Sequence, residues 1–221
     1  ADLEALEDLL PDQPFHAAAV FVGAGETKGW WGAGRASTWA DAVEAARVVA
    51  AALGVPLDVI QGDDAAFHPG RTATLVVDDV VVGHAGEVHP RVVAAFDLPE
   101  RTCAMEMDLD ALMASAHPVA PAPDFGSQPL AKEDIALVVP DSVAVADVEA
   151  AVRAGAGDLC EDVRLFDVYV GPQVPPGHRS LAFALRLRAP DRTLSAEEIL
   201  SVREAAVAEA MLRHGAVLRG S

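Results

Sequence analysis

Residues 179–199, RSLAFALRLRAPDRTLSAEEI, decide the fold of this chain. The first half alternates apolar side chains with other side chains, and this period of two predicts a β-strand with one buried face. The predicted buried face consists of Leu181, Phe183, Leu185 and Leu187. The second half predicts the start of a helix, because Ser195 is suited to the N-cap and Glu198 completes a capping box. Leu194 and Ile199 are placed to form the hydrophobic staple that accompanies such a cap.

The segments on either side complete an alternating order of strands and helices. Before the quoted stretch we predict a strand at 132–140, a helix at 142–157 capped by Ser142 and closed by Gly155, and a strand at 162–171. After it, the long helix should run to about Arg213, and a last strand should follow at 216–220. The order βαββαβ is that of the ferredoxin-like fold.

Strand alternation also predicts which side chains lie on the sheet face that no helix covers. If Phe166, Val168 and Val170 face the helices, the opposite face carries mainly small residues, one aromatic residue and two arginines. The candidate RNA-binding residues on that face are Tyr169, Ser180, Arg186 and Arg188. Aromatic stacking and arginine contacts are the means by which such sheets bind single-stranded RNA. A solvated face, or a surface that docks another domain, fits the same residues equally well.

The first part of the chain is rich in strands and has few helices. Ser37 and Thr38 can cap an amphipathic helix at 39–54, and Asp78-Asp79 tolerates the tight turn of a hairpin between two β-rich runs. The other predicted elements are strands at 15–23, 72–77, 80–86 and 102–109 and short helices at 91–99 and 108–115. This pattern is typical of an antiparallel sheet, so the fold class of the chain is α+β.

Two His-Pro pairs flank the predicted hairpin. A proline restricts the preceding residue to extended geometry and stops a strand, so we predict that His68, Pro69, Gly70, His89 and Pro90 form structural turns. A zinc site needs three or four convergent ligands, usually closely paired in sequence, and these histidines lack that spacing. We therefore expect no metal site here.

Composition and charge exclude several classes of function. The 34 acidic and 16 basic side chains give a net formal charge of −18, which opposes attraction to DNA or to an anionic membrane, so an RNA contact must be local. Residues 1–123 hold 19 acids and 6 bases, whereas residues 124–221 hold 15 and 10 and are the less repulsive partner for RNA. Cys103 and Cys160 form no CxxC motif, and no apolar run is long enough to span a bilayer, so we expect a cytoplasmic protein.

No catalytic constellation is evident. The glycine-rich segments 23–29 and 32–37 lack the features of a nucleotide-binding loop and are predicted to be turns. The proline-rich stretch at 117–129 predicts a linker between a domain at 1–116 and a domain at 130–221.

Five segments, in this order, resemble the C-terminal portion of the bacterial phenylalanyl-tRNA synthetase β-subunit family. They are FHPGRTA (67–73), GHAGEVHP (83–90), LFDVYVG (165–171), SLAFALRLRAPDRTLSAEEI (180–199) and GAVLR (215–219). The resemblance implies that 1–116 is the last part of an inactive catalytic-like domain, a relative of the class II synthetase antiparallel sheet. It implies that 130–221 is the ferredoxin-fold domain that binds the anticodon stem-loop.

The resemblance also implies the activity of the whole enzyme. That enzyme would be an α2β2 heterotetramer that attaches phenylalanine to its tRNA using ATP and Mg²⁺, with the active site in the α subunit. This chain would then be a non-catalytic part that binds no cofactor itself, packs against α and contacts tRNA. Because Ala1 falls in what the pattern makes the middle of a fold, we expect a part of a longer protein.

One position departs from the family pattern. The family usually has an arginine before the Asp-Ile-Ala of the first ferredoxin strand, whereas this chain has Glu133. This departure removes one expected positive charge and weakens any transfer of RNA-contact residues at that point. A protein-docking fragment without RNA contact is an alternative, as is, more remotely, a ferredoxin-like sensor of small molecules. Salt-sensitive binding of tRNA distinguishes the first reading from both, because phosphate contacts release counterions.

Overall fold

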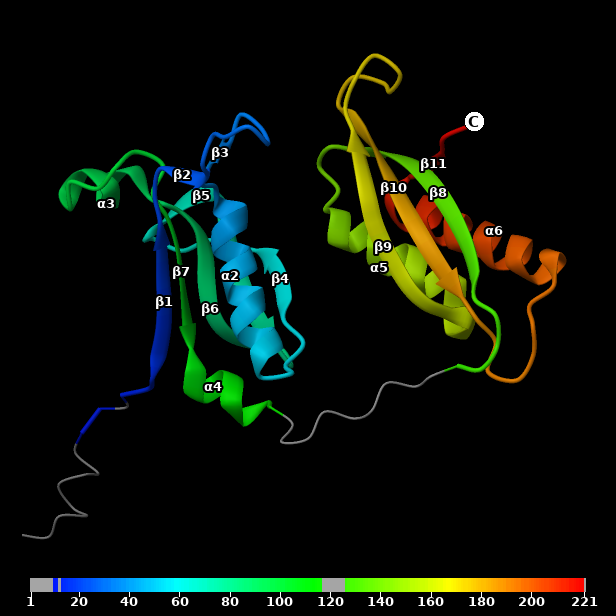
Figure 1. Cartoon of the computed structure of the whole chain (residues 1–221), viewed down its shortest axis with the longest axis horizontal. Coiled ribbons are helices and arrows are strands. Elements are labelled where there is room, and N and C mark those ends of the chain that lie inside the picture. The colour runs from blue at the N-terminus through cyan, green and yellow to red at the C-terminus, as the bar shows by residue number, and fades with distance from the viewer. Residues whose placement is uncertain (1–9, 12, 117–125, 221) are drawn as a thin grey trace, which may run out of the picture. The chain divides into compact units, whose positions relative to one another are not determined.

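A computed structural model describes residues 10–11, 13–116 and 126–220. The predicted linker at 117–129 lies mostly outside these residues. The chain divides into two compact units, Ala1–Ala122 and Pro123–Ser221, and each is described by itself. Figure 1 shows both units with their elements labelled. Within the described residues no helix is both long and apolar enough to cross a membrane.

The first unit is built on a five-stranded sheet in which every neighbouring pair is antiparallel. In spatial order the strands are β1 (His16–Phe21), β7 (Cys103–Asp108), β6 (Val80–Val88), β5 (Phe67–Val77) and β4 (Asp58–Gln61). The remaining elements are the small hairpin β2 (Ala24–Glu26) and β3 (Arg35–Ala36) and the helices α2 (Trp39–Ala52), α3 (Pro90–Ala95) and α4 (Leu109–Ala114).

Helix α2 packs across one face of this sheet (Figure 1). Its buried stripe is Ala42, Val43, Ala46 and Ala50, and it packs against sheet residues that include Leu75, Ala85 and Met107. The small alanines let the helix approach the sheet closely, and burial of the apolar face stabilises both elements. The predicted helix and its start after Thr38 are confirmed.

The hairpin between β5 and β6 turns where the sequence predicts. Asp78 and Asp79 have φ values of 49° and 66°, the two positive values that a type I′ turn requires. Gly83 and Gly86 follow in β6, where the neighbouring backbones of β7 and β5 leave no room for a side chain. The neighbouring strands can therefore approach closely at these two positions, because glycine has no Cβ atom.

The second unit has the βαββαβ order that the sequence predicts. Its sheet has the strand order β11-β8-β10-β9 and carries two helices on one face (Figure 1). The elements are β8 (Ala131–Pro140), α5 (Val145–Ala156), the 3₁₀ turn η1 (Gly157–Leu159), β9 (Cys160–Tyr169), β10 (His178–Leu187), α6 (Ala196–His214) and β11 (Val217–Leu218). The fold is α+β, with a ferredoxin-like second unit.

The core of the second unit lies between the sheet and the two helices. Leu181, Phe183, Leu185 and Leu187 are each fully buried, which confirms the face predicted from the alternation in β10. They pack against residues of β8, α5 and α6 that include Ile135, Leu137, Val148, Val152, Ala206 and Ala210. Removing this many branched side chains from water is the main source of stability for the unit.

The two helices of this unit differ in how well their ends were predicted. Helix α6 has the capping box of Ser195 and Glu198, and it ends at Gly215, which has a left-handed φ of 64°. The predicted cap of α5 at Ser142 is wrong, because α5 starts after Ala144 without a side-chain cap. Gly155 does not close the helix but lies inside it, where a Cβ would come 2.8 Å from Cα of Ala206, so its role is a close helix contact.

Candidate nucleic-acid interface

The candidate site is the face of the second sheet that turns away from α5 and α6. On β10 it consists of Ser180, Ala182, Ala184 and Arg186, which alternate with the buried leucines and Phe183. The residues paired with them are Val138, Ala136, Asp134 and Lys132 on β8 and Tyr169, Asp167, Arg164 and Asp162 on β9. Three adjoining strands thus present a floor of small residues with polar and aromatic side chains around it.

A bulge in β9 changes which side chains reach this surface. The pairing shifts by one residue between Ala182 and Phe183, so that Asp167 and Leu165 are paired with them and Phe166 is the extra residue. A bulge re-aims the side chain it carries. Phe166 is 53% exposed and lines a hollow with Ala182, while Leu165 packs against the core instead.

The prediction that Phe166 faces the helices is therefore wrong, whereas Val168 is paired with Leu181 and so lies on the helix side of the sheet, as predicted. Phe166, Val168 and Val170 are all exposed, and none belongs to the core between the sheet and the helices. The prediction for Phe166 failed because a strict period of two assumes that β9 has no extra residue.

Tyr169 contacts Arg219, which follows β11, and we call these two side chains the lid. The guanidinium carbon of Arg219 lies 4.9 Å from the centre of the Tyr169 ring, a cation–π contact, and Nη2 of Arg219 donates to Oε1 of Gln173. Ser180, the partner of Tyr169 in the sheet, is only 3% exposed. Ser180 thus lies on the predicted face but is covered, and we attribute its burial to the side chains that meet above it.

The hollow beside this lid has a volume of about 690 Å³. Its floor includes Ala136 and Ala182, and its walls include the ring of Phe166 and the side chains of Arg219 and Asp134. In such a hollow the aromatic ring can stack on an unpaired base. The arginine can donate hydrogen bonds to the edge of the base, and the carboxylate can accept them.

The two arginines predicted on β10 have different surroundings. Arg186 is exposed, and neither it nor its neighbours Lys132 and Arg164 makes a side-chain hydrogen bond or ion pair within the described residues. The Arg188 side chain is only 17% exposed; it donates to the carbonyl of Gly126 at 2.8 Å and lies 3.0 Å from Glu161. Arg186 is therefore available to a phosphate, whereas Arg188 is already engaged within the domain.

The face is close to neutral. Against the three basic side chains stand Asp134, Asp162 and Asp167, of which Asp162 lies 3.6 Å from Arg153 of α5. Arg219 adds one positive charge beside the hollow. A nucleic acid would therefore bind here through a few local contacts rather than through a broad positive field.

The His-Pro segments of the first unit lie at irregular points of the backbone. His68, Pro69 and Gly70 fall in β5 where its pairing with β6 is interrupted, and Gly70 has a φ of 84°. Nδ1 of His89 accepts a hydrogen bond from the backbone of Arg91 at the start of α3, so this histidine caps the helix that Pro90 begins.

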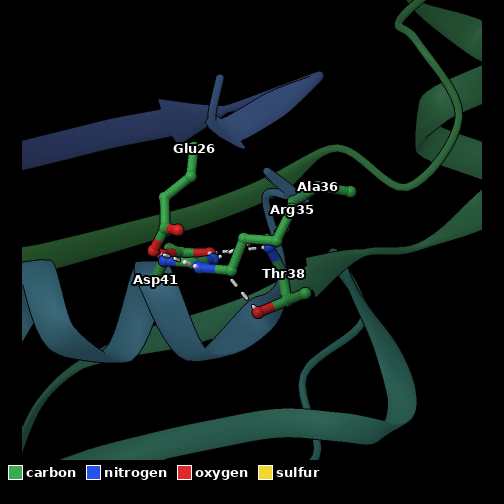
Figure 2. Close-up of polar contacts among 5 residues, drawn as sticks. All are labelled: Glu26, Arg35, Ala36, Thr38 and Asp41. Carbon is green, nitrogen blue, oxygen red and sulfur yellow. Dashed lines mark hydrogen bonds and ion pairs between the residues drawn. The ribbon is translucent and has the colours of Figure 1, made fainter. Parts of the chain in front are cut away.

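Two segments predicted to be turns have more structure than expected. Residues 23–29 and 32–37 contain β2 and β3, which form a hairpin held by Arg35 (Figure 2).

Among the described residues no group of three or more His, Cys, Asp or Glu side chains is arranged to hold a metal ion. Desolvation raises the pKa of both Cys103 and Cys160, so neither thiol is activated as a nucleophile.

The ferredoxin-like order of the second unit and the hollow on its open face are compatible with a nucleic-acid-binding domain, and comparison with known families gives the class. Residues 127–219 match the ferredoxin-fold anticodon binding domain, and residues 3–109 match the phenylalanyl tRNA synthetase beta chain CLM domain. The chain belongs to the phenylalanyl-tRNA synthetase β-subunit family.

Curated relatives are similar over nearly the whole chain. The phenylalanine–tRNA ligase β subunit of Thermobifida fusca is 54% identical over 219 residues, which is 97% of this chain and 26% of the relative. The β subunits of Streptomyces avermitilis and Corynebacterium efficiens are both 51% identical, over 99% and 97% of this chain. The chain thus spans about a quarter of the length of the relatives it matches.

Sequence reasoning missed the lining of the hollow as a site, including Phe166 and Arg219. Phe166 was missed because nothing in the local sequence marks the bulge that exposes it. Arg219 could have been found, because alternation along the predicted last strand places Arg219 on the same face as Val217. In the structure Val217 is paired with Val138 of the open face, and the backbone N–H of Arg219 donates to the carbonyl of Ala136.

Proposed function

We propose that this chain is a non-catalytic part of a phenylalanine–tRNA ligase β subunit and that its second unit binds the anticodon stem-loop of phenylalanine tRNA. The observation that carries the proposal is the hollow formed by Phe166, Arg219 and the alanine floor, on a domain that matches the anticodon-binding family. Binding of a splayed single-stranded base by stacking is the common mode of RNA recognition on open sheets.

The residue roles within this proposal follow from exposure. Tyr169 and Phe166 offer aromatic faces, Arg186 offers a phosphate a guanidinium that has no partner among the described residues, and Ser180 becomes accessible when the side chains above it move apart. Arg188 contributes by holding the start of the domain rather than by touching RNA. We further propose that His68, Pro69, Gly70, His89 and Pro90 act only in the backbone geometry of the first unit.

The proposal extends to the assembly in which the chain works. The first unit would pack against the α subunit of an α2β2 ligase, and ATP and Mg²⁺ would be bound outside this chain. The described residues offer no cluster of metal ligands for such a site, and no step of amino-acid activation is assigned to them. The domain boundaries proposed are 1–116 and 130–221, joined by a linker at 117–129.

A titration with tRNA tests the function. The chain is titrated with phenylalanine-specific tRNA and with an unrelated tRNA, each at 50 mM and 200 mM salt. We expect preferential binding that weakens with salt, because phosphate contacts release counterions. Equal affinity for both tRNAs would leave this chain as a docking fragment within a larger enzyme.

Matched variants locate the surface. Phe166→Ala should weaken binding by roughly 5- to 150-fold, since loss of a stacked base costs about 1–3 kcal/mol. Arg186→Ala should reduce the salt dependence by about one counterion. Arg192→Ala, which removes a basic residue paired with Asp191 and Glu198 at the start of α6, is the control and should leave binding unchanged.

A further inference from the structure

Arg203 lines the hollow of the second unit although it belongs to the helix layer. It is a residue of α6, whereas Ala136 and Ala182 in the same hollow lie on the open face of the sheet. The hollow therefore extends past the edge of the sheet as far as a helix residue. Strand alternation cannot find this basic side chain, because Arg203 does not lie on a strand.

The short length of β11 explains how a helix residue reaches the hollow. β11 pairs only with Val138 and Leu137 of β8, and the backbone N–H of Arg219 donates to the carbonyl of Ala136. On this side of β8 no described strand is paired with the residues before Ala136 (Figure 1). A long side chain from α6 can therefore extend past the free edge of β8 while its charged end stays in water.

The surroundings of Arg203 leave its guanidinium available to a ligand. Its ion-pair partner is Glu133 in β8, whose Oε2 lies 3.9 Å from Nε, which is too far for a hydrogen bond. Nε is buried without a hydrogen-bond partner, and the Arg203 side chain donates no hydrogen bond to any described residue. A guanidinium has five N–H donors, so those of Arg203 must bond to water or to a ligand.

The local charges show what an anion would meet in the hollow. The charged side chains of the lining are Asp134, Arg203 and Arg219, which sum to +1. Glu133 lies against Arg203 outside the lining and brings the local sum to zero. Because Arg219 already contacts Tyr169 and Gln173, Arg203 is the arginine of the hollow that keeps its donors for an anion.

A nucleotide fits this combination of groups. Phe166 lines the same hollow and is 53% exposed, so its ring can stack on a base. A phosphate offers the negative charge and the acceptor oxygens that an arginine fork binds well. The volume of about 690 Å³ lies within the range of roughly 300–1,000 Å³ that is usual for ligand pockets.

We propose that Arg203 binds a phosphate of the RNA whose unpaired base occupies the hollow, and that Glu133 is the counter-ion that this phosphate displaces. The inference rests on the proposed function and adds to it a contact made from the helix layer. Glu133 thus competes with the RNA for Arg203, and the charge of Glu133 limits the affinity of the domain.

Titration of the chain with phenylalanine-specific tRNA at 50 mM and 200 mM salt tests the contact. Arg203→Ala should weaken binding at least roughly fivefold at the lower salt, because a charged hydrogen bond is lost. It should also reduce the slope of log K against log salt by about 0.7, the counterion release of one single-stranded phosphate. Arg203→Lys keeps the charge and should keep most of the slope, which a purely structural role of Arg203 would not affect.

Arg213→Ala is the matched control on the same helix. Arg213 is half-exposed, is paired with Glu209 and does not line the hollow. Its removal changes the net charge of the chain as much as Arg203→Ala does, and it should change the affinity for tRNA less than about twofold. Far-UV circular dichroism and the melting temperature verify that each variant is folded.

Glu133→Gln tests the competition and should act in the opposite direction. The variant keeps the size of the side chain and removes its charge, so binding should tighten by roughly two- to fivefold, the worth of a partly exposed ion pair. In the Arg203→Ala background the same change should have little effect, because Glu133 acts through Arg203. Equal tightening in both backgrounds would show that Glu133 acts only through the net charge.

Three further results would overturn the inference. If the wild type binds tRNA and Arg203→Ala leaves both affinity and salt slope unchanged, the contact is wrong while the proposed function stands. If Arg203→Ala and Arg213→Ala weaken binding equally, the effect comes from total charge rather than from a contact in the hollow. If the wild type does not bind tRNA at either salt concentration, the proposed function fails and the Arg203 contact fails with it.

Discussion

Arg186 lies in β10 and Arg188 one residue past its end, and although the sequence pattern places both on one face, their contacts differ. Arg186 extends from the open face without a partner among the described residues, whereas the Arg188 side chain is mostly buried and joins Gly126 and Glu161 to the end of the strand. Alternation gives the side of a sheet on which a residue lies. It cannot show which neighbours from distant sequence will occupy that residue's hydrogen-bonding groups, so the sequence made the two arginines appear equal.

Replacing Arg188 by alanine should therefore destabilise the second unit. The carbonyl of Gly126 loses a charged donor, and we expect a loss of about 1–3 kcal/mol in the free energy of unfolding measured in urea. Arg164→Ala, which removes an exposed arginine of the same sheet, is the matched control and should cost less than about 0.5 kcal/mol. Equal effects for the two variants would show that the Gly126 contact contributes nothing.

At the scale of elements, the features that were predicted correctly depend on residues close together in the sequence. The turn at Asp78-Asp79 and the capping box at Ser195 are set by local backbone preferences, and both were foreseen. The bulge at Phe166 arises from pairing between β9 and β10, and the start of α5 depends on packing rather than on a cap. Neither leaves a local signal, which is why the hollow was not predicted in full.

The close approach of β6 and β7 makes Gly83 a sensitive position. A Cβ there would overlap the backbone carbonyl of Glu106, so Gly83→Ala must force the strands apart and should cost about 1–3 kcal/mol of stability in urea unfolding. Gly32→Ala is the control, because a Cβ at Gly32 meets no atom within 4 Å. A neutral Gly83→Ala variant would contradict the spacing of the sheet.

The cap of α6 should give stability a specific pH dependence. The bond to the backbone of Ser195, and then the bond from Arg192, lower the pKa of Glu198 from 4.5 to about 2 in the folded chain. The carboxylate therefore contributes stability above pH 4.5 that is lost as the pH falls through about 2. Glu198→Gln should lower the melting temperature at pH 7, and the difference from wild type should vanish near pH 2; a difference that is constant over this range would show that charge plays no part.

On the scale of the whole molecule, the two units carry unequal charge: −13 over residues 1–123 and −5 over residues 124–221. The unit with the smaller excess of acids is the one that carries the candidate RNA surface. Composition predicted this asymmetry, because it depends only on totals, and the periodic patterns of the sequence predicted the fold class. The extent of the linker at 117–129 stays a prediction.

Because the chain carries a large net negative charge, salt should stabilise the folded state but weaken the binding of RNA. Raising NaCl from 50 to 500 mM should raise the melting temperature, because 34 acidic side chains against 16 basic ones repel one another less when screened. The same change should weaken the binding of tRNA. A melting temperature that falls with salt would mean that the ion pairs, such as the one between Arg35 and Asp41, outweigh the net repulsion.

The lid formed by Tyr169 and Arg219 implies a particular time course for complex formation. A ligand that reaches Ser180 must wait until the two side chains separate, so in stopped-flow mixing the observed rate should rise with tRNA concentration and then level off at the rate of opening. Arg219→Ala should abolish that plateau, and a rate that stays linear in the wild type would mean that RNA binds without entering beneath the lid. With a plateau, the speed of capture would be limited by the domain itself, and the ligand would gain contact with Ser180, which is only 3% exposed.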